Sequence, residues 1–182
     1  MSRFAPYRPQ QKSRGLTGVV YRHAHPDDAE AIADIDVERN RDSLERIVPL
    51  IRAELRAIAD GDPNRATFVA QLEDEILAYG RCGGPDRMDR WERHDLPRGW
   101  YLTGVTVASA HRRRGIARDL TLHRLQWLRE RTDSVYYFAA AVNRASIRLH
   151  EGLGFREIRR GITAPGVDFT GGTGLLFECQ LG

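Results

Sequence analysis

The chain has 182 residues, of which 41% are hydrophobic and 29% are charged, a composition typical of one soluble globular domain. Its formal net charge of +3 is too small to indicate a general nucleic-acid binder, and no apolar run is long enough to cross a membrane. The two cysteines, Cys82 and Cys179, lie far apart without the spacing of a metal site, so we expect a reduced, cytoplasmic protein without a bound metal.

The N-terminal segment, residues 1–17, is expected to be a flexible basic tail. Residues 1–15 carry four basic side chains but no apolar core segment, which argues against a signal peptide. Residues 18–182 are then expected to form a single domain. Its first strand is predicted at 18–23, where the residues alternate well enough for a strand.

The sequence after this strand predicts helices. Pro26, Asp27 and Asp28 suit the start of a helix, because proline fits the first turn and acids favour its positive end. Apolar residues then recur at spacings of three and four up to Ile58. One helix of that length would be unusual, so we expect a break near residues 40–43.

Strands are predicted through the middle of the chain. Residues 66–72 and 76–82 predict a hairpin, and residues 100–107 predict a further strand. The polar connection at 83–99 is long, and connections of that length often carry function. A helix with one apolar face is predicted at 116–131.

The C-terminal part predicts three strands and a short helix. Residues 135–142 are almost wholly apolar, as expected of a strand covered on both faces of a sheet. The short helix is predicted at 143–151 and is followed by two glycines that would end it. The last two strands are predicted at 155–158 and 174–181.

The stretch AHRRRGIARDL, residues 110–120, places three consecutive arginines and a glycine before a predicted helix. The first backbone N–H groups of a helix have no partner inside it, and its aligned peptide dipoles add positive charge there. Gly115 would let a phosphate approach these groups closely. The stretch therefore predicts a phosphate site, with a solvated basic surface as the alternative. It has neither the spacing of a nucleotide-hydrolase loop nor that of a dinucleotide-binding turn.

Two motifs resemble the GCN5-related N-acetyltransferases, the GNAT superfamily. Arg112-x-x-Gly115-x-Ala117 resembles the family's [QR]xxGx[GA] signature, and NRASIRLHEGLGF at 143–155 resembles its asparagine, short helix and LGF. The two motifs follow each other in the family's order, and the resemblance covers about residues 20–181. It implies an α/β (α+β) fold with a mixed, mostly antiparallel sheet of six to seven strands, flanked by helices. Two central parallel strands would splay apart, and ligands bind at such openings.

Because the family uses acetyl-coenzyme A (acetyl-CoA) as cosubstrate, the resemblance implies roles for particular residues. The pantetheine arm would bond to the backbone of Val105, Thr106 and Val107. Asn143 and Ser146 would line the arm, although both also suit the cap of the short helix. The pyrophosphate would meet the amides and side chains of Arg112, Arg113, Arg114, Gly115, Ile116, Ala117 and Arg118.

His150 stands where many family members have a tyrosine that protonates the departing CoA thiolate. A histidine can also donate a proton, and phosphinothricin-type acetyltransferases resemble this chain in reading LHE at that place. The resemblance implies that His150 is catalytic and lies beside the cofactor, with a purely structural histidine as the alternative. It also implies that the amide of Val107 stabilises the oxyanion.

The base that deprotonates the acceptor amine is less well defined. The family often uses a carboxylate on the first parallel strand, but residues 101–107 contain no acid. Glu38, in the N-terminal helical region that walls the family's acceptor pocket, is one candidate. Glu92, His94 and Asp95 in the long connection are others, and a water chain is a further alternative.

The sequence thus predicts an N-acetyltransferase that moves an acetyl group from acetyl-CoA to a primary amine of a small molecule or peptide, by direct attack in a ternary complex. The N-terminal helices, the connection 83–99 and the glycine-rich segment 163–174 would form the acceptor pocket. One alternative is a non-catalytic CoA- or acyl-CoA-binding module of the same fold, and another is a nucleic-acid binder using HRRRGIAR. We expect no nucleic-acid or membrane partner and leave a homodimer open.

Overall fold

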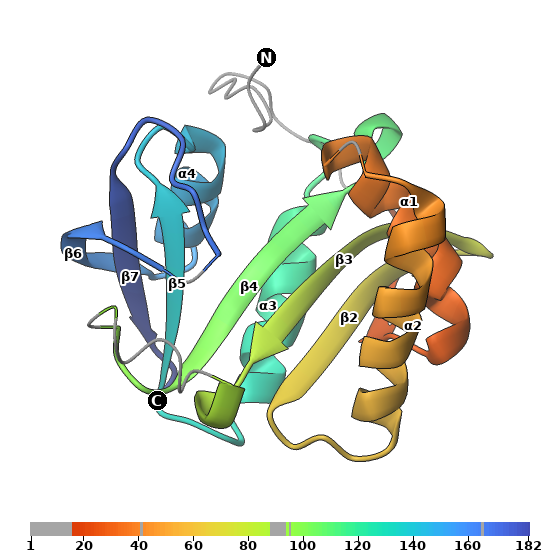
Figure 1. Cartoon of the computed structure of the whole chain (residues 1–182), viewed down its shortest axis with the longest axis horizontal. Coiled ribbons are helices and arrows are strands. Elements are labelled where there is room, and N and C mark those ends of the chain that lie inside the picture. Colours follow the sequence, from red (N-terminus) through yellow and green to blue (C-terminus); the bar gives the residue numbers. More distant parts are fainter. Residues whose placement is uncertain (1–15, 41, 88–93, 95, 165) are drawn as a thin grey trace. The chain divides into compact units, whose positions relative to one another are not determined.

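The structure is a computed structural model that describes residues 16–40, 42–87, 94, 96–164 and 166–182. Most of the predicted tail, together with Glu92 and Asp95, lies outside these ranges. The elements in chain order (Figure 1) are β1 (Val20–His23), η1 (Pro26–Asp28), α1 (Ala29–Asn40), α2 (Leu44–Ala59), β2 (Arg65–Leu72), β3 (Glu75–Gly83), η2 (Pro85–Arg87), β4 (Trp100–Val107), η4 (Ser109–His111), α3 (Ile116–Leu128), β5 (Ser134–Ala140), α4 (Arg144–Glu151), β6 (Arg156–Ile162) and β7 (Gly174–Gln180).

The described chain forms two compact units. The N-terminal unit consists of residues 16–82 and 104–124, and the C-terminal unit consists of residues 83–103 and 125–182. Strand β4 and helix α3 each contribute residues to both units. The single domain expected over 18–182 stays a prediction. Among the described residues, no helix combines the length and the apolar character that a membrane crossing needs.

The strands form a seven-stranded sheet in the order β1-β2-β3-β4-β5-β7-β6. β1 is antiparallel to β2, and β7 is antiparallel to both β5 and β6. The parallel pair is β4 with β5, in which Trp100 is opposite Val135 and Tyr101 is opposite Tyr136. The predicted fold class, a mixed and mostly antiparallel sheet with helices, is confirmed with seven strands.

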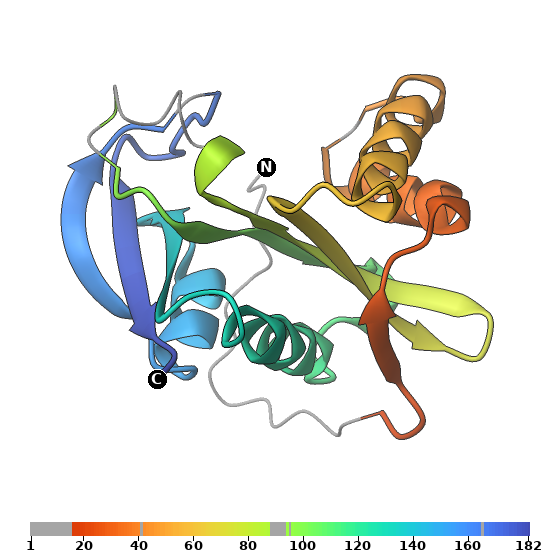
Figure 2. The same cartoon turned by 90° about the horizontal axis from the view of Figure 1, so that it is seen from below.

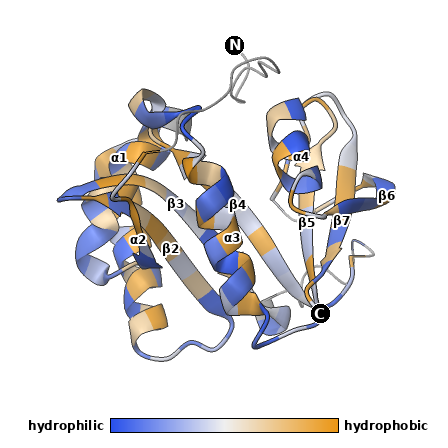
Figure 3. Cartoon of the chain, turned by 180° about the vertical axis from the view of Figure 1, so that it is seen from behind, coloured by the Kyte–Doolittle hydropathy of each residue, from blue (hydrophilic) through white to orange (hydrophobic). Residues whose placement is uncertain are grey.

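In the N-terminal unit, α1 and α2 pack side by side on one face of the strands, and α3 lies on the other face (Figure 2). One apolar cluster contains residues of α1, α2, β2 and β3, among them Ile32, Ile35, Leu55, Val69 and Tyr79, and these five are all at most 5% exposed. Hydrophilic and apolar residues alternate along α3 (Figure 3). The apolar residues that recur at spacings of three and four in α1 and α2 therefore face the strands and form the core of this unit.

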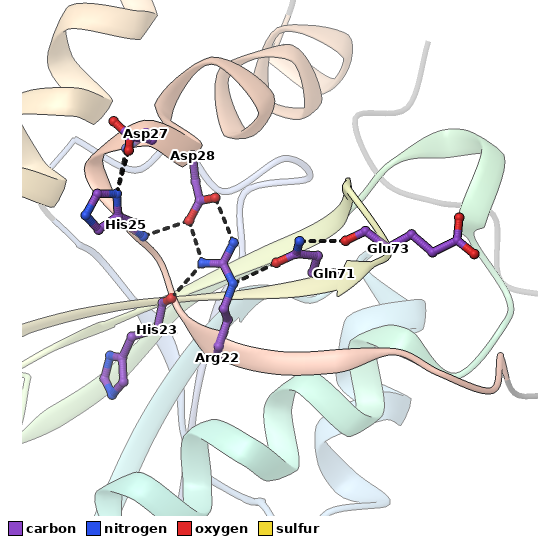
Figure 4. Close-up of polar contacts among 7 residues, drawn as sticks. All are labelled: Arg22, His23, His25, Asp27, Asp28, Gln71 and Glu73. Atoms are coloured by element: carbon purple, nitrogen blue, oxygen red, sulfur yellow. Dashed lines mark hydrogen bonds and ion pairs between the residues drawn. The ribbon is translucent and has the colours of Figure 1, made fainter.

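A polar network fixes β1 to its neighbours (Figure 4). Two Arg22 nitrogens donate to the Asp28 carboxylate at 2.7 and 2.8 Å, and Arg22 Nε donates to Gln71 Oε1 at 2.7 Å. Gln71 in turn donates to the Glu73 carbonyl at 2.6 Å, and the His25 amide donates to Asp28 at 2.7 Å. The network joins β1, β2 and η1, and so it sets where α1 begins.

The long helical region divides where the sequence predicts, because α1 ends at Asn40 and α2 begins at Leu44. Helix α3 ends at Leu128, three residues before its predicted end. The Arg131 amide bonds to the Leu128 carbonyl at 2.8 Å, and this tighter i→i−3 bond closes the helix.

Two strand ends in the C-terminal unit differ from the prediction. β5 ends at Ala140 rather than at residue 142, because the Asn143 amide turns back to the Ala140 carbonyl at 2.8 Å. β6 continues to Ile162, beyond the predicted 155–158. Its first six residues are all exposed and show no alternation, because β6 is an edge strand. Charged side chains on such a strand oppose pairing with another chain.

Candidate active site

Strand β4 is irregular at Gly104, whose φ of +116° favours glycine. The Gly104 carbonyl accepts a hydrogen bond of 2.8 Å from Arg124 Nη1. The same nitrogen donates to the Arg81 carbonyl of β3 at 3.1 Å, and Nη2 donates to the Thr121 hydroxyl at 2.9 Å. Arg124 of α3 therefore holds β3 and β4 together just before the predicted cofactor residues.

Arg124 is a buried cation. Its side chain is 0% exposed, and this burial lowers the pKa of its guanidinium. Gly80 provides the space, because a Cβ at that position would lie 2.9 Å from Arg124 Cζ. Burial also raises the pKa of the neighbouring Cys82 thiol to about 12. The role of Arg124 could not be predicted from the sequence, because an arginine in an amphipathic helix ordinarily faces solvent.

The three residues predicted to bind the cofactor arm end β4 in the N-terminal unit. Val105 and Val107 are partly exposed, whereas Thr106 is 5% exposed. Thr106 hydrogen-bonds through its side chain to Tyr79 of β3. The Tyr79 hydroxyl donates a short hydrogen bond to Asp36 of α1. This network is not predicted from the sequence. Tyr79 could have pointed to it, because a tyrosine in a predicted buried strand usually has a hydrogen-bond partner for its hydroxyl.

The chain just after β4 is fixed by contacts to its neighbours. The Ala108 amide donates to the Leu77 carbonyl at 2.9 Å, and Arg112 Nε donates to the Val107 carbonyl at 3.1 Å. Arg112 is thereby positioned between the strand end and the helix start. These bonds keep β4 and the glycine turn in a fixed relation within the N-terminal unit.

Glu38, the predicted base, accepts a hydrogen bond from the Ser109 amide at 3.1 Å. Hydrogen bonds from the hydroxyl and the amide of Ser109 lower the pKa of Glu38, and Arg112 lowers it further. The exposed carboxylate is consequently ionised at neutral pH and is a weaker base than an ordinary glutamate. Its role as the base stays a prediction.

The glycine turn has the geometry of a helix start that can hold an anion. Arg113 and Gly115 have φ values of +66° and +83°, and α3 begins at Ile116. The first N–H groups to bond back are those of Arg118 and Asp119, both to the Gly115 carbonyl, at 2.9 and 3.1 Å. The amides just before them therefore have no carbonyl partner within the helix.

The side chains around this turn differ in exposure. Ile116 is buried and anchors the helix, and Ala117 is partly exposed. The arginines of the motif are all exposed: Arg112, Arg113, Arg114 and Arg118. Their charges therefore surround the turn from solvent, and Arg118 also pairs with Asp119 at 3.2 Å.

In the C-terminal unit, Asn143 caps α4 as predicted. Its side-chain oxygen accepts a hydrogen bond from the Ser146 amide at 3.3 Å. The Ser146 hydroxyl accepts a hydrogen bond from the Tyr137 hydroxyl at 2.8 Å, and burial raises the pKa of Tyr137. Ser146 is thus a cap partner, and it links α4 to β5.

His150 is buried on the same helix, with 2% of its surface exposed. Its Nδ1 lies 2.8 Å from the Ser146 carbonyl. A carbonyl only accepts, so Nδ1 carries the hydrogen, and in the neutral ring Nε2 is then an acceptor. His150 can donate a proton from Nε2 only when both nitrogens are protonated. Phe155 packs edge-on against the ring, with centroids 5.2 Å apart.

The polar connection and the glycine-rich segment meet in the C-terminal unit. His94 Nδ1 lies 2.8 Å from Thr163 Oγ1, so this candidate base contacts the segment 163–174. Asp86 pairs with Arg98 at 2.9 Å, with both side chains 62% exposed. The other two candidates in the connection, Glu92 and Asp95, lie outside the described residues.

The structure therefore distributes the predicted site residues between the two units. The N-terminal unit holds Glu38, Val105, Thr106, Val107, Arg112, Arg113, Arg114, Gly115, Ile116, Ala117 and Arg118. The C-terminal unit holds Asn143, Ser146 and His150. In the N-terminal unit, Arg112 is bonded to the Val107 carbonyl and the Asp36–Tyr79–Thr106 network includes Thr106. In the C-terminal unit, hydrogen bonds along α4 link Ser146 to Asn143 and to His150.

Comparisons with known proteins identify the family. The sequence model of the Acetyltransferase (GNAT) family matches residues 29–155, whereas no curated protein matches the chain. A ribosomal-protein-alanine N-acetyltransferase from Brucella melitensis has 26% identity and a TM-score of 0.66, and covers 88% of this chain and 99% of its own. The ribosomal-protein-S18-alanine N-acetyltransferase from Escherichia coli has 16% identity and a TM-score of 0.64, with 90% and 94% covered.

A spermidine N-acetyltransferase chimera from Vibrio cholerae and hSSAT shows a similar likeness. Its identity is 14% and its TM-score is 0.67, with 91% of this chain and 96% of the chimera covered. The family match includes both the glycine turn and the Asn143 motif, and these structures share the fold. The chain belongs to the GNAT family of acetyltransferases.

Proposed function

We propose that the protein is an acetyl-CoA-dependent N-acetyltransferase that transfers the acetyl group to a primary amine of a small molecule or peptide. The amine attacks the thioester directly, in a ternary complex. The observation that carries the proposal is the glycine turn, because the first amides of α3, which have no carbonyl partner within the helix, lie there among exposed arginines shortly after β4. The turn lies within the residues that match the acetyltransferase family. We therefore expect the anion at this turn to be the pyrophosphate of acetyl-CoA.

The N-terminal unit supplies the main cofactor contacts in this proposal. The backbone amides ahead of Arg118, whose own N–H donates to the Gly115 carbonyl, hold the pyrophosphate. The exposed arginines, Arg118 included, add charge-assisted hydrogen bonds through their side chains. The backbone of Val105 and Thr106 binds the pantetheine arm. The Val107 amide stabilises the oxyanion as the amine attacks. The hydrogen bond from Arg112 to the Val107 carbonyl fixes the peptide that follows this residue.

The C-terminal unit contributes α4 and the proton donor. Asn143 and Ser146 contact the cofactor arm while they cap the helix. His150 protonates the CoA thiolate in its doubly protonated form, after which the neutral ring keeps its Nδ1 hydrogen on the Ser146 carbonyl. The likeness to phosphinothricin-type enzymes around His150 belongs to the same proposal.

The acceptor class is supported by the relatives' names. Those structures are named as N-acetyltransferases for ribosomal protein alanine and for spermidine. A protein amine and a polyamine are both amine acceptors, so a primary amine is the acceptor we propose here.

A second candidate is a non-catalytic CoA- or acyl-CoA-binding sensor of the same fold. It is favoured by two observations on the described residues. β4 carries no carboxylate, and His150 is only 2% exposed. A sensor would bind CoA without releasing thiol.

The release of free CoA thiol from acetyl-CoA separates the two candidates. The protein is incubated with acetyl-CoA and a panel that contains spermidine, a peptide with N-terminal alanine, and simple primary amines. We expect amine-dependent thiol release and a higher melting temperature with CoA, because a ligand of the folded state stabilises it. Stabilisation by CoA without thiol release for any amine would favour the sensor. No stabilisation by millimolar CoA would contradict both.

A further inference from the structure

A hydrogen-bonded chain of three side chains in the N-terminal unit ends at a carboxylate. Thr106 of β4 bonds to the Tyr79 oxygen, and the Tyr79 hydroxyl donates to Asp36 Oδ1. Because Tyr79 uses its hydrogen on Asp36, Thr106 is the donor in its bond to Tyr79. The Thr106 hydrogen therefore points to Tyr79 and the Tyr79 hydrogen points to Asp36. This series of hydrogen bonds connects β4 to a proton acceptor on α1.

The chain begins at the strand that the proposed function assigns to the cofactor. Thr106 lies between Val105 and Val107, whose backbone groups bind the arm and the oxyanion in that proposal. An amine that attacks a thioester held along this strand must come close to Thr106. Asp36 itself is partly exposed, whereas Tyr79 is only 3% exposed, so the carboxylate also reaches solvent and can release a proton there.

Three other carboxylates of α1 and α2 are less suited to accept this proton. Glu54 of α2 is paired with Arg81 Nε at 3.3 Å. Glu38 is held by Ser109, and the hydrogen bonds lower its pKa. Asp34, on the same helix as Asp36, is exposed. Asp36 is the carboxylate among them whose hydrogen-bond partner connects it to β4.

Burial and the bond to Asp36 keep the Tyr79 hydroxyl neutral. Burial raises the pKa of Tyr79, Arg81 opposes this effect, and the bond to Asp36 raises the pKa further. The Arg81 guanidinium lies 4.7 Å from the centre of the Tyr79 ring and is attracted to Asp36 and to Glu54. Tyr79 therefore passes or orients a proton without becoming a stable phenolate.

We propose that Asp36 is the base that accepts the proton of the acceptor amine, and that Tyr79 positions it; this inference rests on the proposed acetyltransferase function. The ammonium group gives one proton to Asp36, directly or by a concerted shift through Thr106 and Tyr79. The neutral nitrogen then attacks the thioester carbon, the C–N bond forms and the C–S bond breaks. The nitrogen loses a second proton after the attack. One of the two protons ends on the CoA sulphur, and the other is released to solvent.

Asp36→Asn is the first test, because asparagine keeps the size and an oxygen acceptor for Tyr79 but cannot take the proton. For an amine that the wild type acetylates, we expect kcat/KM at pH 7 to fall by about 10²-fold or more. The rise in melting temperature with CoA should be unchanged. The loss should shrink as pH rises toward the pKa of the amine, since the free base then needs no acceptor. Asp34→Asn, an exposed position on the same helix, is the matched control and should keep its rate.

Asp36→Ala with added formate is a second test that does not depend on asparagine folding well. Formate supplies a carboxylate in the space left by the side chain. We therefore expect the rate of Asp36→Ala to be at least about tenfold higher with formate than without it. Tyr79→Phe removes only the positioning hydroxyl and should cost about tenfold in kcat, with a smaller change in KM.

The outcomes separate this inference from the function on which it rests. If CoA raises the melting temperature of the wild type but no amine is acetylated, the proposed function is overturned. If the wild type is active and the kcat/KM of Asp36→Asn lies within threefold of the wild-type value, only the role of Asp36 is overturned. The same holds if Glu38→Gln loses the rate while Asp36→Asn keeps it, or if formate gives no rescue of Asp36→Ala.

Discussion

The rings of Tyr137 and His150 stack face to face, with centroids 3.7 Å apart and planes within 8° of parallel. Stacking on one side and the Ser146 carbonyl at Nδ1 fix the orientation of the imidazole. A fixed ring is what a proton donor at Nε2 requires, but it is also what a structural histidine would show. The two roles differ in their kinetic consequences.

Replacing His150 by glutamine should lower kcat without abolishing CoA binding. Glutamine can still donate a hydrogen bond to the Ser146 carbonyl, but it cannot deliver a proton, so we expect a loss of about 10²-fold. The melting-temperature rise with CoA should remain. Tyr137→Phe keeps the ring and removes only its hydroxyl, and it should keep the rate within about threefold while it costs about 1 kcal/mol of stability. An unchanged kcat in His150→Gln would exclude His150 as the acid.

Replacing Gly115 by alanine should weaken CoA binding. Its φ of +83° strains any other residue by about 1–2 kcal/mol, and a methyl group would stand where the phosphate approaches. Gly61→Ala is a matched control, because Gly61 has a φ of +97° and open space around it at the end of α2. Both variants should lose similar stability in urea unfolding. Only Gly115→Ala should weaken CoA binding in titration calorimetry, and equal weakening in both would argue against a phosphate at the turn.

The glycine turn could be predicted from sequence because its information is local. Arg112, Gly115 and the start of α3 lie within a few residues of one another, and the turn conformation follows from the glycine. The order of helices and strands was predictable for the same reason, since apolar periodicity repeats within each element.

Contacts between distant segments could not be predicted in this way. Asp36 and Tyr79 are 43 residues apart, as are Arg81 and Arg124. Nothing in the local pattern of α1 or α3 shows which polar residue turns inward to meet a strand. The extent of β6 was missed for a related reason, because an edge strand of exposed charges has no apolar alternation to read.

Stability should depend on pH through the Arg22–Asp28 pair (Figure 4). Burial tends to raise the pKa of Asp28, but hydrogen bonds from Arg22 and from the His25 backbone outweigh it and lower the pKa below 3.8. A group with a lowered folded pKa contributes stability above its unfolded pKa and loses it as pH falls through the folded pKa. We expect Asp28→Asn to reduce the free energy of unfolding by about 2 kcal/mol at pH 7.

Urea unfolding at pH 7, 5 and 3 would check this prediction. The difference between wild type and Asp28→Asn should be constant from pH 7 to 5 and should shrink below about 3.8, the ordinary pKa. Asp27→Asn, at a neighbouring side chain that is 92% exposed, should show no such difference. A wild-type advantage that persists unchanged at pH 3 would contradict the assignment to Asp28.

Arg124 and Gly80 should behave as a coupled pair. Arg124→Met removes the charged donor of the Gly104 and Arg81 carbonyls, and the loss of a hydrogen bond from a charged group costs about 1.5–3 kcal/mol. Gly80→Ala places a methyl group 2.9 Å from Arg124 Cζ, and such overpacking costs about 1–3 kcal/mol. In the double variant the methyl group meets a flexible thioether instead of a bonded guanidinium. Its loss of stability in urea should therefore be smaller than the sum of the two single losses, and an additive result would show that Gly80 is not needed to seat Arg124.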